Sequence, residues 1–408
     1  MLTYEEARQK VIEVVRARRR LTPTERADLS EAFGRVLAEQ IRADRDYPPF
    51  DRSTRDGFAV RAQDASAPGA ALEVIGEIKA GDAFAGRIGP GQCAQIMTGA
   101  AVPAGADAVV MLEHTKTTTA RAKTSVVIER SAEPGQNIVP RGSEAQAGQA
   151  LLDRGMRLGY AELAVAAQVG HNHFTVFRRP RVAILSTGDE VVSVEDRPGP
   201  FEIRNSNGVS LAALATLAGA EPVQLGNSPD RADVLRAMVE RGLEADIVVL
   251  SGGVSMGKYD LVEAVLRELE AEFSFDAVAI RPGRPAVFGV CREKFVFGLP
   301  GNPVSTMVTF ELLVLPAIDL VGGAAPRPLP LFRARLAAPV RQKAALTHFL
   351  PAKVSWEGGE ASVSELPWQG SGDIVALAAA NCFLVVPQTQ LELAAGEWVN
   401  VLPRRGVF

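Results

Sequence analysis

Short apolar runs alternate with longer amphipathic stretches through the middle of the chain. The apolar runs are typical of buried parallel strands, and the stretches between them have the period of helices. The runs are 182–185, 247–250 and 295–297, and the clearest helical stretches are Ser206–Ala218 and Arg231–Leu243. This alternation predicts an open, doubly wound α/β sheet from Arg181 to about Val321.

The N-terminal third begins with helical signals. Thr3 and Glu6 have the spacing of a capping box, which predicts a helix through about Arg19. A second helix is expected from Ser30 toward Ile41, and a third over Tyr160–Val169.

Two other segments have the short alternating runs of β structure. The first is Tyr47–Pro140, with expected strands at 72–78, 93–97 and 125–128. The second follows a Pro-rich linker at 324–330, with expected strands at 332–337, 362–366, 383–386 and 398–402. Because helical stretches flank the first β segment, we interpret it as an insertion into a helical domain.

Composition restricts the class of protein. The 408 residues exceed one ordinary core, and a net charge of -4 gives no basic excess for nucleic acid. Met1 to Arg20 is charged throughout, and the apolar stretch Phe310–Val321 is interrupted by Glu311, Pro316 and Asp319, so neither secretion nor a membrane span is expected. Three dispersed cysteines favour buried thiols in a reduced cytoplasm.

Each of the three apolar runs ends in a Gly-rich turn. The turns are Ser186–Glu190, Ser251–Ser255 and Leu299–Pro303. A strand, a Gly-rich turn and a helix in that order place backbone N–H groups at the carboxyl edge of a parallel sheet, where phosphates bind. We therefore expect one shared site for a phosphorylated ligand, with Ser305 capping the next helix or contacting phosphate.

Charged residues accompany these turns. Asp189, Glu190 and Asp260 could hold Mg²⁺, although a single Asp in such a place more often caps a helix. Arg281 and Arg284 flank a Pro-Gly turn between apolar runs, which favours a buried, positioned turn that suits an oxyanion; the alternative is an exposed basic turn. The chain has no GxSxG, Walker A or GxGxxG motif, which disfavours hydrolase, P-loop and Rossmann functions.

Taken together, five segments closely resemble the MoeA-type molybdopterin molybdenumtransferases, a family that includes the E domain of gephyrin. They are Pro48–Asp51 with Asp56–Val60, Ile96–Gly99, Ser186–Glu190, Ser251–Gly257 and Gly298–Ser305. Asp56 and Thr98 are ordinary turn residues by local chemistry, and gain interest only from this resemblance.

The resemblance implies four domains and an elongated homodimer with the active cleft between subunits. The domains are a split helical scaffold and dimerisation domain (1–46 and 141–178), an inserted β domain (47–140), a molybdopterin-binding α/β domain (179–325) and a small β-barrel-like C-terminal domain (326–408). The implied reaction inserts molybdate into adenylylated molybdopterin with Mg²⁺ and releases AMP. A molybdopterin adenylyltransferase and downstream cofactor-handling proteins are the expected partners.

The resemblance also assigns residues by motif position. Catalytic acids are Asp56, Glu190, Asp230 and Asp260, of which the last three would hold the metal. Substrate-binding positions are Thr98, Glu144, Thr187, Gly188, Ser251, Gly252, Gly253, Arg281, Arg284, Pro300, Gly301, Asn302 and Ser305. The chain departs from the family pattern with Glu144 in place of Asp, Arg281 and Arg284 in place of Lys, Lys258 in place of an acid, and no arginine near His348.

Two other functions remain open. The α/β domain also resembles that of the molybdopterin adenylyltransferases, which transfer a nucleotide from ATP. The gephyrin relative clusters membrane receptors, so a non-catalytic scaffold is the second alternative.

Overall fold

The computed structural model describes residues 1–120, 123–253, 261–342 and 345–407, and it divides into two compact units. Unit 1 contains Met1–Glu39, Arg154–Gly159 and His173–Phe408. Unit 2 contains Gln40–Asp153 and Tyr160–Asn172. The division into four domains stays a prediction.

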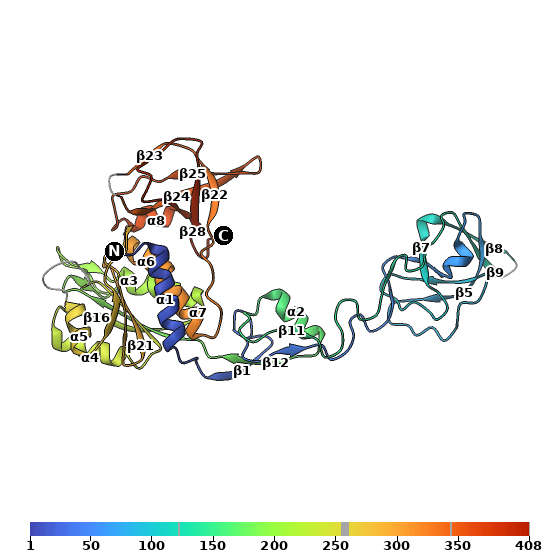
Figure 1. Cartoon of the computed structure of the whole chain (residues 1–408), viewed down its shortest axis with the longest axis horizontal. Helices are drawn as coiled ribbons and strands as arrows, with labels where there is room; N and C mark the ends of the chain where they lie inside the picture. Colours follow the sequence, from blue (N-terminus) through green and yellow to red (C-terminus); the bar gives the residue numbers. More distant parts are fainter. Residues whose placement is uncertain (121–122, 254–260, 343–344, 408) are drawn as a thin grey trace. The chain divides into compact units, whose positions relative to one another are not determined.

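Unit 1 is built on a six-stranded sheet in the order β16-β13-β17-β21-β20-β18 (Figure 1). The strands are β13 (Arg181–Thr187), β16 (Glu221–Ser228), β17 (Ile247–Ser251), β18 (Glu272–Phe275), β20 (Val287–Cys291) and β21 (Lys294–Leu299). Strands β16, β13, β17 and β21 pair in parallel, while β20 pairs antiparallel with both β21 and β18. The predicted α/β fold class is confirmed, with an antiparallel pair added at one edge.

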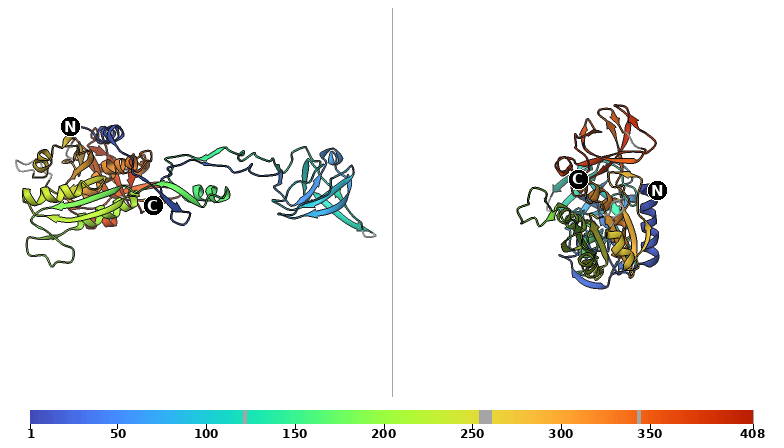
Figure 2. Two further views of the ribbon diagram at one scale, coloured as in Figure 1. Left: turned by 90° about the horizontal axis from the view of Figure 1, so that it is seen from below. Right: turned by 90° about the vertical axis from the view of Figure 1, so that its left-hand side faces the viewer.

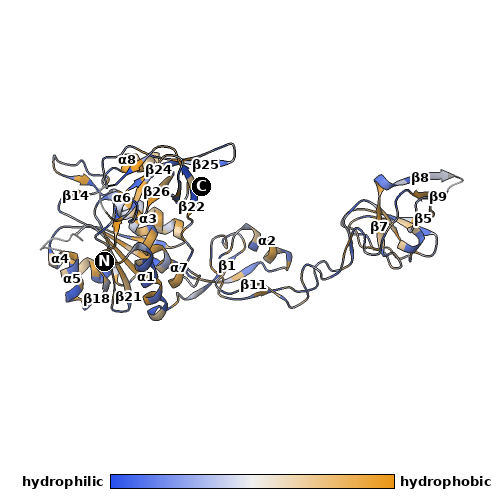
Figure 3. Ribbon diagram, turned by 45° about the horizontal axis from the view of Figure 1, so that its top comes forward, coloured by the Kyte–Doolittle hydropathy of each residue, from blue (hydrophilic) through white to orange (hydrophobic). Residues whose placement is uncertain are grey.

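Helices cover both faces of this sheet, as Figure 2 shows from two further sides. They are α3 (Ser206–Ala218), α4 (Ala232–Gly242), α5 (Leu261–Glu268), α6 (Pro303–Thr309) and α7 (Leu315–Val321). On β13, Val182 and Ile184 pack with α3 and α7, whereas Ala183 and Leu185 pack with α4 and α5. Strands buried on both faces explain the continuous apolar runs, which are orange in Figure 3.

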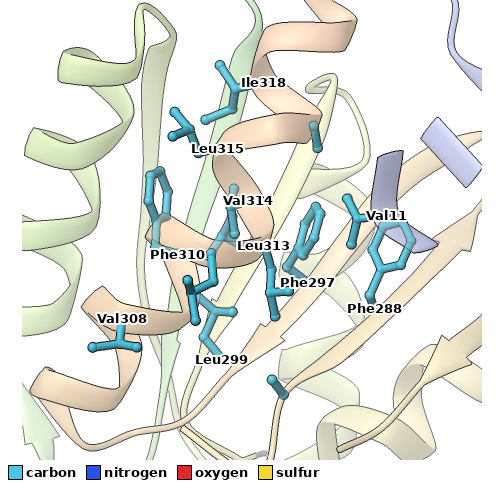
Figure 4. Packing of buried hydrophobic residues seen from close by; sticks show 14 of the residues in the cluster. Val11, Phe288, Phe297, Leu299, Val308, Phe310, Leu313, Val314, Leu315 and Ile318 are labelled. Atoms are coloured by element: carbon cyan, nitrogen blue, oxygen red, sulfur yellow. The ribbon is translucent and has the colours of Figure 1, made fainter. Parts of the chain in front are cut away.

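The run from α6 to α7 is the central helix of the unit. A π-helical turn, Phe310–Val314, joins the two helices. Phe310, Leu313 and Ile318 belong to the buried cluster, and Leu313 lies beside Phe297 (Figure 4). Pro303–Val321 is long and apolar enough to cross a membrane by composition, yet 94% of that window is buried inside the protein. It is therefore a core helix, and its first residues follow directly on the third Gly-rich turn.

Helix α1 (Tyr4–Arg18) begins at the predicted capping box, in which the Thr3 side chain accepts from Glu6 N and the Glu6 carboxylate from Thr3 N. Its buried face, including Val11 and Val15, packs against the central helix. The helix expected from Ser30 is wrong. Gly34 N and Leu37 N donate to Leu158 O and Met156 O, so distant backbone replaces the helical hydrogen bonds.

The C-terminal part of unit 1 is a six-stranded sheet in the order β19-β24-β25-β22-β28-β26. Its strands are β19 (Ile280–Arg281), β22 (Phe332–Leu336), β24 (Thr347–Glu357), β25 (Glu360–Glu365), β26 (Cys382–Val386) and β28 (Trp398–Pro403). Helix α8 (Ile374–Ala379) lies between β25 and β26 in the sequence. The additional pairing of β24 with β26 closes the sheet into the expected small barrel. Sequence analysis missed β24, its longest strand.

Unit 2 contains a curled sheet in the order β7-β4-β6-β5-β9-β8 (Figure 1). Its strands are β4 (Gly57–Val60), β5 (Ala71–Ile78), β6 (Gln92–Ile96), β7 (Ala108–Met111), β8 (Thr115–Ala120) and β9 (Lys123–Ile128). Outside the sheet are β2 (Ile41–Arg42), β3 (Arg52–Ser53), β10 (Ile138–Val139), β11 (Ala150–Leu152) and α2 (Tyr160–Gln168). In unit 1, β1 (Thr24–Asp28) pairs with β12 (His173–Phe177).

Candidate functional site

The three Gly-rich turns meet at the carboxyl edge of the unit 1 sheet. Gly252 has φ +94°, and a Cβ there would lie 2.7 Å from the carbonyl oxygen of Thr187. A Cβ on Gly301 would lie 3.4 Å from Gly252 Cα. The turn after β17 thus approaches the end of β13 more closely than a side chain would allow, and the turn after β21 lies in van der Waals contact with that turn, as a cradle for a phosphorylated ligand requires.

Three asparagines that sequence analysis missed hold these turns. The amide nitrogen of Asn207 donates to Ser251 Oγ and to Gly301 O, both at 2.7 Å. Asn205 caps α3 and accepts from Ser186 Oγ at 2.8 Å. Asn227 donates to the carbonyl oxygens of Gly188 and Val191. Asn205 and Asn207 stand together at the start of the otherwise apolar helix α3, and this pair of amides was the sequence feature that could have indicated their role.

The turns line a pocket of about 550 Å³, which we call the carboxylate pocket because Glu190 and Asp230 lie on its wall. Thr187, Gly188, Ser251, Gly252, Gly253, Gly301 and Asn302 also line it. Within the described part of the chain, Thr187 Oγ1 and Asn207 Oδ1 are buried without a hydrogen-bond partner. Buried polar atoms left in this way are available to a ligand.

The acids of this pocket repel one another. The pKa of Asp230 is raised mainly by its partial burial and, to a smaller extent, by the negative charges of Asp189 and Glu190. Asp189 Oδ1 accepts from Asp230 N at 2.9 Å, which holds the two turns together. Neighbouring carboxylates, of which Asp230 has a raised pKa, are oxygen donors of the kind that a hard cation such as Mg²⁺ prefers.

The metal set expected from the sequence is Glu190, Asp230 and Asp260. The structure brings the first two to one pocket, while Asp260 lies outside the described residues. Over the described ranges, no group of three or more His, Cys, Asp or Glu side chains is arranged to hold a metal ion.

A second pocket, of about 770 Å³, lies between the α/β sheet and the C-terminal barrel. We call it the basic pocket because Arg281 and Arg284 line it, together with Ser305 and Pro300. Asn302 and Gly372 line both this pocket and the carboxylate pocket, so the two are adjacent. One ligand group in each pocket could therefore react with the other.

Two details of this pocket differ from expectation. The expected buried Arg turn is buried only at Pro282 and Gly283, since Arg281 and Arg284 are exposed. Exposure leaves both guanidinium groups accessible to an anion. Ser305 is buried within α6 and does not cap it, because Asn302 is the N-cap residue.

The remaining predicted residues lie in unit 2. Asp56 accepts from Thr98 N at 2.6 Å and from Thr98 Oγ1 at 2.8 Å. These bonds, the backbone one first, lower the pKa of Asp56. Glu144 pairs with Arg52 at 3.0 Å. The structure thus joins Asp56 to Thr98, and it joins Glu144 to strand β3, which shortly precedes Asp56.

The fold and the two pockets define a multidomain protein built around an α/β ligand-binding domain. Family models match along the chain: the MoeA N-terminal region (domain I and II) over residues 2–170, a probable molybdopterin binding domain over 183–320 and the MoeA C-terminal region (domain IV) over 333–403. The chain is 35% identical over 380 residues to a molybdopterin molybdenumtransferase of Staphylococcus epidermidis, covering 92% of this chain and 90% of that protein.

Another relative, the molybdopterin molybdenumtransferase of Bacillus subtilis, is 36% identical over 385 residues, with 93% of this chain and 89% of that protein covered. Two crystal structures of MoeA proteins from Pyrococcus horikoshii are similar, with TM-scores of 0.73 and 0.80 at 34% and 28% identity. They cover 97% and 99% of this chain, and 98% and 100% of those chains. The chain belongs to the MoeA-type molybdopterin molybdenumtransferase family, and it is a transferase.

Proposed function

We propose that this protein inserts molybdate into adenylylated molybdopterin and releases AMP, in a Mg²⁺-dependent reaction. The observation that carries the proposal is the adjacency of the carboxylate and basic pockets, which share Asn302 and Gly372. Two anionic substrates need two sites that differ in charge and are close enough for reaction.

In the carboxylate pocket, the backbone of Ser251, Gly252 and Gly253 binds the phosphates of the adenylylated substrate. Glu190, Asp230 and Asp260 would hold Mg²⁺, which would supply positive charge to neutralise the acids and to polarise the phosphoanhydride. The fit rests on the raised pKa of Asp230 and on the oxygen-only donors. Asn207 keeps two of the turns in register by its bonds to Ser251 and Gly301.

In the basic pocket, Arg281 and Arg284 bind molybdate or a substrate phosphate through bidentate hydrogen bonds. Ser305 lines the same pocket and adds a hydroxyl. Arginine in both positions provides planar forks with fixed geometry, which orient a tetrahedral oxyanion better than point charges do.

We further propose a cytoplasmic homodimer in which Asp56, held by Thr98, completes the carboxylate pocket of the second copy. The hydrogen bonds from Thr98 keep the Asp56 carboxylate ionised and oriented. Glu144 forms an ion pair with Arg52, which shortly precedes Asp56 in the sequence. A molybdopterin adenylyltransferase would supply the substrate, and cofactor-handling proteins would take the product.

Complementation of cells that lack the insertion enzyme tests this function. We expect restored molybdoenzyme activity with the wild-type chain and none with Asp260→Asn or Asp230→Asn at equal protein levels. A pure scaffold would fail to complement in every form. ATP-dependent formation of adenylylated molybdopterin by the purified chain would instead identify an adenylyltransferase.

A further inference from the structure

The basic pocket contains an acid that the proposed reaction does not use. Glu365, at the end of β25, lines this pocket together with His348 of β24 and the two arginines of the Arg281–Arg284 turn. Among the described lining residues, these four are the charged or titratable ones. An ionised carboxylate here offsets one of the two positive charges and repels an incoming anion.

The Glu365 carboxyl is held in place and is partly shielded from water. It is half-buried and accepts a hydrogen bond from the Trp368 side chain, which lines the same pocket. Burial raises the pKa of this carboxyl, and the Trp368 bond opposes that rise. A protonated carboxyl can donate a hydrogen bond to an oxyanion, whereas the ionised form can only accept one.

We propose that Glu365 makes oxyanion binding in the basic pocket proton-dependent, weak while its carboxyl is ionised and tight once it is protonated. The inference rests on the proposed role of Arg281 and Arg284 as an oxyanion site. It predicts that the protein takes up its oxyanion together with a proton, so that affinity increases as the pH falls.

His348 is the competing source of such a pH dependence, because protonating an imidazole would also favour an anion. The two explanations differ in the effect of neutral substitutions. Glu365→Gln removes the negative charge, keeps an acceptor for Trp368 and adds a permanent donor, so it should bind tightly at every pH. His348→Gln removes a potential positive charge and should leave the Glu365-dependent change in place.

The experiment measures binding of sulfate, which stays a dianion throughout, to the full chain by equilibrium dialysis between about pH 4.5 and about pH 7.5, a range that extends upward from the ordinary carboxyl pKa, with molybdate as a second probe at the upper end. For the wild type we expect about tenfold weaker binding at the upper limit than at the lower one. Glu365→Gln should be tight and nearly independent of pH. Glu360→Gln, an exposed acid on the same strand, is the matched control and should behave as wild type.

Trp368→Phe provides a second variant that does not alter charge. Loss of its hydrogen bond to Glu365 should move the binding transition to higher pH. A pH dependence that persists in Glu365→Gln, or that disappears in His348→Gln, would overturn the inference and leave the anion site intact. Absence of saturable binding by the wild type at any pH would overturn the anion site itself, and the inference with it.

Discussion

Replacing Asn207 by Ala tests whether one buried amide holds the ligand turns together. Asn207 has an exposed fraction of 9%, and its amide nitrogen donates two hydrogen bonds of 2.7 Å, to Ser251 Oγ and Gly301 O. The substitution removes both bonds and leaves their acceptors poorly satisfied. At about 1 to 1.5 kcal/mol for each bond, the expected loss of stability is about 2 to 3 kcal/mol.

The expected loss of activity is larger than this loss of stability implies. The two bonds fix the second Gly-rich turn relative to the third, and a displacement of about 1 Å in a reacting group can reduce the rate about a hundredfold. We therefore expect kcat/KM for AMP release to fall by a factor on the order of 100 in Asn207→Ala. The assays are steady-state AMP release and denaturant unfolding followed by circular dichroism.

Thr216→Ala is the matched control. Its hydroxyl also makes a hydrogen bond on α3, to Ala212 O at 2.9 Å, but it is exposed and lines neither the carboxylate pocket nor the basic pocket. It should change stability by less than about 0.5 kcal/mol and leave AMP release unaltered. If Asn207→Ala folds and releases AMP within a factor of two of wild type, the positioning role of Asn207 is refuted.

Three further changes have distinct expected outcomes. Asp230→Asn should raise Tm near neutral pH, because a raised pKa of the Asp230 carboxyl means that its ionisation opposes folding. The gain should vanish below pH 3.8, where the carboxyl is protonated in both the folded and the unfolded state. In thermal melts, added Mg²⁺ should stabilise the wild type more than this variant. Gly252→Ala should abolish AMP release, whereas Gly226→Ala, at a matching φ of +93° but with nothing within 4 Å of its Cβ, should lose only about 1 kcal/mol in denaturant unfolding and remain active. Asp319→Asn should lower the free energy of unfolding by about 3 to 5 kcal/mol, because Asp319 is fully buried and pairs with two arginines. Asp233→Asn, at an exposed ion pair, should lower it by less than about 1 kcal/mol. Equal losses would contradict the burial argument.

Local patterns predicted the parts of the fold that depend on local interactions. The Thr3 capping box, the amphipathic stretch of α4 and the apolar runs of β13 and β17 all have the structure that their sequences favour. The segment after Ser30 does not, because its backbone hydrogen bonds go to residues far along the chain. The first half of strand β24 pairs with β19 and β26, which lie far from it along the chain, so no local pattern indicated it. Its second half forms a hairpin with β25 across Gly358 and Gly359, a local signal that sequence analysis did not use.

The candidate site was predictable to the same extent. Parallel strands ending in Gly-rich turns must bring those turns to one edge, so the carboxylate pocket followed from the sequence. The amide of Asn207 did not, because its partners Ser251 and Gly301 become neighbours only in the folded sheet. Glu365 and His348 reach the basic pocket through barrel pairing, which no local pattern of theirs indicates.

The most direct test of the account is AMP release from purified adenylylated molybdopterin by the wild-type protein, measured with and without molybdate and with and without Mg²⁺. The account predicts rapid release only when both are present, with molybdenum retained in the pterin product. Equal AMP release in the absence of molybdate, or retention of the adenylylated substrate with both added, would contradict it.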